Sequence, residues 1–280
     1  MTPLHFTLIT FAVSTVAGVL GSLLGLGGGI IVIPLLTLLM HIDIRYAIGA
    51  SIVSVIATSS GAAAAYVREH MTNLRVGMFL ELGTTSGALV GAYIAGHINP
   101  SWLFIIFGVI LGYSAVEMVR HRSDDGSRAV PPDYLADRLA LHGQYFDQSL
   151  GRNVIYRVTH TLLGLSLMFV AGGVSGLLGI GSGALKVPAM DLAMRMPIKV
   201  STATSNFMIG VTAATSAGVY FARGDINPFV AAPVAAGVLL GATAGSRLLG
   251  RLSGRSVRMV FVVVLVAISV EMLMKGFKSL

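Results

Sequence analysis

Long apolar segments follow one another along almost the whole chain, and short polar connections separate them. We place these segments at about 4–24, 29–41, 45–67, 75–97, 101–120, 155–178, 184–194, 200–222, 228–247 and 257–275. Most are about 20 residues long, the length of helix that crosses about 30 Å of hydrocarbon. Continuous apolar runs predict helices rather than membrane strands. The pattern therefore predicts an all-α polytopic membrane protein.

A polar stretch divides this pattern into two membrane halves. The predicted units are a first membrane repeat at 1–120, a cytoplasmic polar linker at 121–154 and a second membrane repeat at 155–280. Within the linker, Pro131, Pro132 and Asp133 are typical of a helix start, and the leucines that follow suit either a short interfacial helix or a solvated loop. The first apolar segment lacks a basic leader and a clear cleavage site, so we expect a retained span rather than a signal peptide.

The two halves match without a gap when the second is shifted back by 154 positions. The matches include pairs that chance rarely produces in a chain rich in glycine, alanine and valine: Pro34 with Pro188, Tyr66 with Tyr220, Asn73 with Asn227, and Glu117 with Glu271. This regularity predicts an internal duplication. An odd number of segments per copy turns the second copy over, so we predict two inverted-topology repeats of about five apolar segments each.

Charge refines this topology. Charged residues form 11% of the chain, whereas about 25% is usual for a soluble domain. The net charge of +7 comes from arginines and lysines in alternate connections, with six arginines in 120–157 and four in 247–258. The positive-inside rule places these connections in the cytoplasm and both termini outside, so the basic composition does not indicate a nucleic-acid partner. The chain has no cysteine, which excludes disulfides and thiol chemistry.

One glycine-rich motif occurs once in each half. It reads GLGGGIIVIP from Gly25 to Pro34 and GIGSGALKVP from Gly179 to Pro188. Irregular backbone at membrane depth survives only against protein or a water-lined cavity. Because the segments after the glycines are short, we predict short broken or re-entrant helices. The predicted breaks are at Gly25, Pro34, Gly179 and Pro188. Helix starts that face one another near the midplane would offer N–H groups to an anion, and close helix packing is the alternative.

Polar groups near the breaks are candidates for substrate binding. Lys186 is an intramembrane charge, which indicates a functional site, and a structural ion pair with Asp191 or a glutamate is the alternative. Nearby hydroxyls can bind a small oxyanion or can bond to other helices and to their own backbone. The predicted substrate-binding residues are Gly27, Gly28, Gly29, Ser51, Ser54, Gly181, Ser182, Gly183, Lys186, Ser205 and Asn206.

Other polar and glycine positions carry weaker signals. Glu81 lies inside a span and could carry a proton, but the sequence favours a structural role. The G-x-x-x-G patterns at 83–91 and 237–245 predict close helix packing. No catalytic constellation, metal cluster or cofactor motif is evident, because the histidines are scattered and G-I-G-S-G-A at 179–184 lacks a strand before it. We therefore expect no enzyme activity, no cofactor and no metal.

At these residues the sequence resembles the sulfite exporter TauE/SafE family of bacterial membrane permeases. The resemblance rests on the G-x-G-G-G-x-x-x-x-P element from Gly25 to Pro34, on its second copy, and on two apolar repeats around a polar middle, and it covers essentially the whole chain. It implies a multi-pass protein of the bacterial cell inner membrane that transports small sulfur-containing anions. Ser182 departs from the glycine pattern.

Together these observations predict a secondary transporter of a small sulfur-containing anion such as sulfite or a sulfonate. The anion would bind near the bilayer midplane between the two glycine-rich breaks and move by alternating access. A passive anion channel and a non-transporting membrane scaffold are the alternatives. The expected partners are the anionic substrate, the lipid bilayer and either a proton or sodium as a coupling ion, and the oligomeric state is left open.

Overall fold

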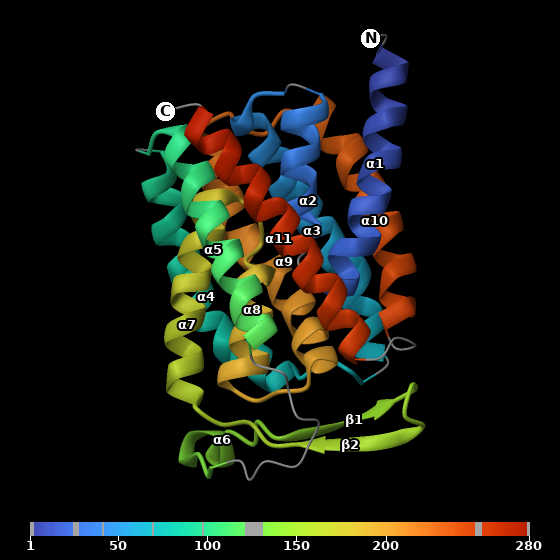
Figure 1. The fold of residues 1–280 in the computed structure, drawn as a ribbon, viewed down its shortest axis with the longest axis vertical. Helices are drawn as coiled ribbons and strands as arrows, with labels where there is room; N and C mark the ends of the chain where they lie inside the picture. Colours follow the sequence, from blue (N-terminus) through green and yellow to red (C-terminus); the bar gives the residue numbers. More distant parts are fainter. Residues whose placement is uncertain are drawn as a thin grey trace.

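The computed structural model of the protein describes residues 3–24, 28–40, 42–68, 70–96, 98–120, 131–249 and 254–278. These residues form a bundle of helices with a small two-stranded sheet at one end (Figure 1). Five helices among them are long and apolar enough to cross a membrane. The predicted class of all-α polytopic membrane protein is therefore confirmed, and the chain is a multi-pass membrane protein.

Two series of helices build the bundle. The first comprises α1 (Pro3–Leu24), α2 (Gly29–Pro34), the π-helical turn η1 (Leu35–Leu39), α3 (Ile44–Arg68), α4 (Leu74–Ala95) and α5 (Pro100–Arg120). The second comprises α7 (Thr161–Leu178), α8 (Gly183–Pro188), the π-helical turn η2 (Ala189–Ala193), α9 (Ile198–Ala222), α10 (Pro228–Leu249) and α11 (Gly254–Lys278). From α2 onward, every element of the first series has a counterpart that begins 154 residues later.

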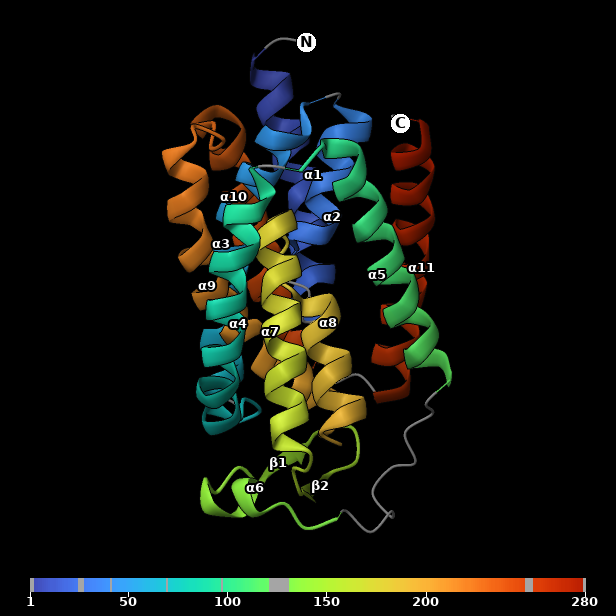
Figure 2. The ribbon, with the colours of Figure 1, turned by 90° about the vertical axis from the view of Figure 1, so that its left-hand side faces the viewer.

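The two series run in opposite directions. Helix α1 begins at the end of the bundle far from the sheet, whereas α7 begins at the sheet end (Figure 1). The series also interlock, because α1 packs along α10, α3 contacts α9, and α7 packs along α4 (Figure 2). Helices α5 and α11 pair beside this group. Each half thus supplies a face that the other half covers.

Each short helix folds back toward the end of the bundle where its hairpin began. At the end of η1, Met40 Sδ accepts a hydrogen bond of 3.3 Å from Thr10 Oγ1 in the first half of α1. At the end of η2, Met194 O accepts one of 3.3 Å from Thr159 N, just before α7. The pairs α1 with α2–η1 and α7 with α8–η2 are therefore helical hairpins that enter the bundle from opposite ends and turn back inside it.

The backbone at the two turns has the same shape. Gly28 and Ser182 occupy matched positions, and both have a left-handed conformation, with φ of 71° and 57°. A side chain in this conformation costs about 1–2 kcal/mol, so Ser182 departs from the glycine pattern in sequence while keeping the backbone that the pattern requires. Pro34 and Pro188 each end a short helix, and a π-helical turn follows because proline has no N–H to continue the α-helical ladder.

Glycines bring the long helices into backbone contact. A Cβ added to Gly87 on α4 would overlap the carbonyl oxygen of Phe169 on α7, and one added to Gly241 on α10 would overlap that of Thr15 on α1. The G-x-x-x-G patterns therefore lie at close helix contacts, as the sequence predicted.

From residue 131 on, the linker holds more regular structure than the sequence indicated. This described part contains a short helix α6 (Tyr134–Arg138) and an antiparallel hairpin of β1 (Gly143–Asp147) and β2 (Arg152–Tyr156). The short helix was one of the two predicted alternatives, but the hairpin was not predicted. The predicted apolar segment at 155–178 also begins too early, because β2 continues to Tyr156 and α7 starts only at Thr161, after His160 with a φ of 51°.

A buried ion pair attaches this hairpin to the bundle. Asp147, at the end of β1, accepts hydrogen bonds from Lys199 Nζ on α9 at 2.8 Å, from Ser149 Oγ at 2.6 Å and from Tyr145 OH at 3.0 Å. Burial raises the pKa of Asp147, but the bonds from Lys199, Ser149 and Tyr145 outweigh burial and lower the pKa from 3.8 to about 2. Lys199 on α9 thus holds the linker against the membrane helices.

The lowered pKa predicts how the hairpin responds to acid. Its stabilising contribution is complete above the ordinary pKa of 3.8 and is lost as the pH falls toward about 2. Hydrogen exchange at the amides of Ser149 and Leu150, which donate to Asp147 Oδ1, should accelerate in that window beyond the intrinsic pH effect. Lys199→Met should move the loss to higher pH, whereas Arg152→Met, an exposed cation on the same hairpin, should not; equal shifts would contradict the assignment.

The helix contacts predict a contrast between two glycines. Gly87→Ala should lower the free energy of unfolding by about 1–3 kcal/mol, because the methyl group has no space against the backbone of α7. Gly218→Ala on α9 should be neutral or slightly stabilising, because nothing lies within 4 Å of the added Cβ. Thermal unfolding in detergent measures both. A loss as large for Gly218→Ala as for Gly87→Ala would refute the packing account.

Candidate functional site

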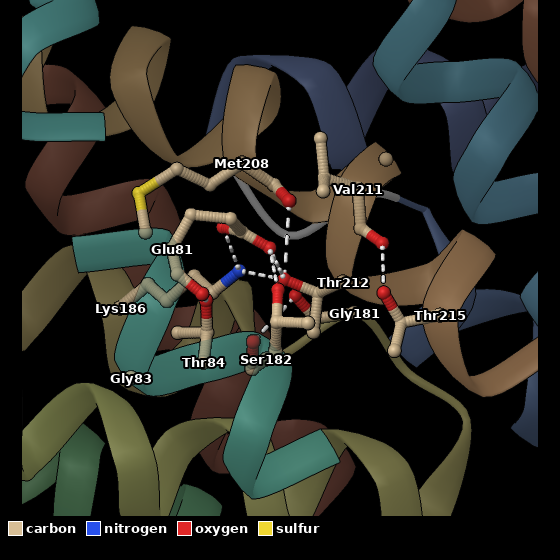
Figure 3. Close-up of polar contacts among 12 residues, drawn as sticks. Glu81, Gly83, Thr84, Gly181, Ser182, Lys186, Met208, Val211, Thr212 and Thr215 are labelled. Atoms are coloured by element: carbon tan, nitrogen blue, oxygen red, sulfur yellow. Dashed lines mark hydrogen bonds and ion pairs between the residues drawn. The ribbon is translucent and has the colours of Figure 1, made fainter. Parts of the chain in front are cut away.

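A fully buried lysine meets a buried glutamate where the two halves join. Lys186 on α8 is 0% exposed, and its Nζ donates a hydrogen bond of 2.6 Å to Thr212 Oγ1 on α9. The same Nζ lies 3.7 Å from Glu81 Oε2 on α4 (Figure 3). The first half of the chain thus supplies the carboxylate of this pair, and the second half supplies the ammonium group and the hydroxyl.

The carboxylate of Glu81 is only partly satisfied. Its Oε1 accepts hydrogen bonds from Thr212 Oγ1 at 2.6 Å and from Thr85 Oγ1 at 3.1 Å, whereas Oε2 is buried without a hydrogen-bond partner. A lysine ammonium has three N–H donors, and the described residues show one hydrogen bond from Lys186. Unused donors therefore face an unused acceptor, which leaves hydrogen-bonding capacity for a small ligand.

The partner of Lys186 resolves one open alternative. The sequence allowed a structural ion pair with Asp191 or with a glutamate, and the structure shows the pair with Glu81. The counterparts of Lys186 and Glu81 in the other half are Val32 and Ala235. The ion pair therefore occurs once, although the surrounding helices are duplicated.

The glycine-rich breaks are held together by contacts between the halves. Ser51 Oγ on α3 donates to Gly179 O at 2.9 Å, and Asn206 Nδ2 on α9 donates to Ser22 O at 2.9 Å. A Cβ on Gly29 would lie 3.5 Å from the Cα of Ile180. Since each central helix bonds the end of the other half's hairpin, the two breaks are neighbours.

Apolar side chains fill the contact between the breaks. Val55 and Ile209 would each lie 2.8 Å from a Cβ on Gly181, and with Ala213 they form a small buried cluster. The conformation is therefore closed at this point, and a ligand between the breaks would require these side chains to separate.

Matched tyrosines satisfy the last turns of the two hairpin helices. Tyr66 OH on α3 donates to Ser22 O at 2.9 Å, and Tyr220 OH on α9 donates to Gly176 O at 2.8 Å. Tyr66 and Tyr220 are a pair in the 154-residue register, as are Ser22 and Gly176. Two matched carbonyl groups near the ends of the hairpin helices thus accept the same bond in both halves.

The predicted site residues fall into three groups. Gly25 and Gly27 lie outside the described residues. Lys186, with Ser182 and Gly181 nearby, reaches the pair with Glu81 (Figure 3), and Gly183 begins the helix that carries it. Of the rest, Gly28 and Gly29 begin α2, Ser51 and Asn206 bond across the breaks, Ser54 Oγ bonds its own helix at Ser51 O, and Ser205 is buried on α9.

Sequence reasoning missed the way in which Glu81, Thr85 and Thr212 converge. Thr212 repeats at the matched position of Thr58, and Glu81 is an acidic residue inside an apolar span, so each was visible alone. Their meeting depends on the crossing of α4 with α9, and no local pattern in the sequence encodes that crossing.

The two ends of the bundle differ. A cavity of about 20 Å³, wide enough for a water molecule, lies between α1 and α2–η1; it is lined by Ile9, Thr10, Val13, Ser14, Val32, Leu35, Leu36 and Met40. The counterparts of Ser14, Leu36 and Met40 are Met168, Met190 and Met194, which belong to a buried cluster with linker residues such as Tyr145. At the sheet end, methionines and linker residues therefore fill the position that matches this cavity.

The chain is similar to one protein family and to several known proteins. The family model described as sulfite exporter TauE/SafE matches residues 10–272. The chain is 27% identical over 278 residues to the probable membrane transporter protein YunE of Bacillus subtilis, which covers 97% of this chain and 98% of the relative. It is 25% identical over 276 residues to a probable membrane transporter protein of Xylella fastidiosa, with 98% and 97% covered. No solved structure matches the chain.

The ion pair predicts non-additive effects on stability. Lys186→Met alone should cost about 3–5 kcal/mol of unfolding free energy, because it leaves the Glu81 carboxylate buried without its cation. Adding Glu81→Leu to Lys186→Met should recover much of that loss. Thermal unfolding of the two single variants and of the double variant measures the coupling. Additive losses would show that Lys186 and Glu81 do not stabilise one another.

Proposed function

Because the chain belongs to the sulfite exporter TauE/SafE family, we propose that this membrane transporter is a secondary transporter of a small sulfur-containing anion such as sulfite or a sulfonate. The observation that carries the proposal is the fully buried Lys186, whose ammonium group makes one hydrogen bond among the described residues and so retains unused donors. The family description supplies the sulfur chemistry, and the lysine supplies the preference for an anion.

The chemistry of the site suits a small oxyanion. An ammonium group removed from water attracts an anion more strongly than an exposed one, because the surrounding dielectric is low. Thr212 can turn its hydroxyl to donate to a bound oxygen, and Ser182 lies close to the same lysine (Figure 3). The tight packing around the breaks favours a ligand of a few atoms, so we propose that the anion binds next to the breaks, near the middle of the membrane.

The arrangement of the hairpins supports alternating access. The α1 and α7 hairpins enter from opposite ends, and each can be withdrawn from its own side of the site. In this conformation the sheet end is closed by Met168, Met190 and Met194 together with the linker. A passive channel would need a path open at both ends at once, and this packed layer argues against one.

Ligand-induced stabilisation tests the anion site. Sulfite or methanesulfonate should raise the unfolding temperature of the purified protein, since a ligand at about one hundred times its Kd adds about 2.7 kcal/mol. Lys186→Met should weaken binding at least about tenfold through loss of a charge-assisted hydrogen bond. Ser51→Ala and Ser205→Ala should keep binding within a few fold. An unchanged affinity in Lys186→Met would overturn the assignment of this lysine.

Flux in proteoliposomes tests the transport mode. A secondary transporter should accumulate the anion above its external concentration when an ion gradient is imposed, and it should show exchange between labelled and unlabelled anion. Flux that only dissipates the anion gradient and never exceeds equilibrium would favour a pore. Vesicles that contain Lys186→Met protein serve as the matched control.

A further inference from the structure

The ion pair at the site also indicates which ion drives transport. On the premise of the proposed function, we infer that Glu81 takes up a proton when the anion binds, so that one proton crosses with each monovalent anion. The inference rests on three observations: the burial of both charges, the Glu81 oxygen that has no hydrogen-bond partner, and the ion pair that the described residues show between Glu81 and Lys186.

The buried site carries two opposite charges, those of Lys186 and Glu81. Lys186 and Glu81 are 0% and 9% exposed, so the positive and the negative charge of this buried pair balance one another. A bound anion would add an uncompensated negative charge, and an unpaired buried charge is costly enough that a titratable group neutralises instead. Protonation of Glu81 restores neutrality, because the loaded site then holds the ammonium and the anion as its two charges.

One oxygen of the Glu81 carboxylate has room for a proton. Glu81 Oε2 lies 3.7 Å from Lys186 Nζ, too far for a hydrogen bond, and has no other partner. It is therefore an available position for a proton. An ionised carboxylate can only accept hydrogen bonds, whereas a protonated carboxyl can donate one. The same atom would thus change from a group that repels an oxyanion into one that binds it.

Thr212 links the two groups. Its Oγ1 accepts from Lys186 at 2.6 Å and donates to Glu81 Oε1 at 2.6 Å. Once Glu81 is neutral, this hydroxyl loses its charged acceptor and can donate to the anion. The proton on Glu81 and the anion on Lys186 therefore favour one another, which is positive coupling between two ligands.

The other ionisable groups on the neighbouring helices have partners elsewhere or lie away from the site, so Glu81 is the proposed proton acceptor. Helix α7, which packs along α4, carries none over Thr161–Leu178. On α9, Lys199 is bonded to Asp147 of the linker, and Tyr220 donates to the backbone of α7. On α8–η2, Asp191 follows Lys186 by more than a turn, and the ammonium that faces Glu81 is that of Lys186. On α4 itself, Arg75 lies at the linker end, where it bonds Ala140 O.

A proton fits this site better than a sodium ion. A sodium ion at Glu81 would lie beside the Lys186 ammonium and would be repelled by its like charge. A proton instead forms a covalent bond to the carboxylate oxygen and removes one charge, so no cation remains next to the lysine. The described residues also contain no group of three histidines and carboxylates that could hold a metal ion.

Proton uptake on binding tests the inference directly. Methanesulfonate is the preferred probe, because its charge does not change with pH, and sulfite is tested beside it. Added to wild-type protein in weakly buffered solution, methanesulfonate should cause the uptake of up to one proton per site, which is measured as a rise in the pH of the solution. Its affinity should fall as the pH rises, by up to about tenfold per pH unit. Glu81→Gln, which mimics the protonated carboxyl, should bind with pH-independent affinity and take up no proton.

Glu271→Gln is the matched control, since it removes a carboxylate of α11 and should leave both signals unchanged. In proteoliposomes, a methanesulfonate gradient should drive proton movement in the same direction, and Glu81→Gln should retain anion exchange without proton flux. Binding or transport without proton uptake would overturn the inference and leave the proposed function intact. Absence of binding by both anions would overturn the proposed function and the inference together.

Discussion

Helices α1 and α7 end inside the bundle, and the carbonyl groups of their last turns must find partners there. Tyr66 and Tyr220 bond the last turn of the hairpin helix in their own half, while Ser51 and Asn206 reach across to the other half. Helices α3 and α9 therefore lie in the centre because they carry these side chains. The glycines of α4 and α10 then bring the hairpins close enough to be bonded.

This framework is duplicated, but its charge is not. The positions of Lys186 and Glu81 are occupied in the other half by Val32 and Ala235. Duplicated helices of opposite direction suit a protein that opens toward either end of the bundle. The ion pair occurs once, so there is one charged site to which either opening can lead. Under the proposed alternating access, the methionines and the linker would close the sheet end, and the cavity lies at the other end.

Simple sequence patterns predict much of this architecture. Apolar length gave the helices, the 154-residue register gave their correspondence, and Pro34 and Pro188 marked the short segments. The hairpin in the linker was not predicted from the sequence, because polar residues dominate its surroundings. In the structure, Gln144–Asp147 and Val154–Tyr156 alternate in burial as strands do. Partners that depend on tertiary crossings, such as Glu81 with Lys186 and Asp147 with Lys199, have no local signature.

The central claim is that one buried site is reached from the two membrane faces in turn. The chain has no cysteine, so Thr212→Cys introduces a single thiol beside Lys186. Labelling with a membrane-impermeant thiol reagent, applied to right-side-out and to inside-out vesicles, measures access from each side. We predict labelling from both sides, with sulfite or methanesulfonate shifting the balance between them. Labelling confined to one side under every condition would contradict the account.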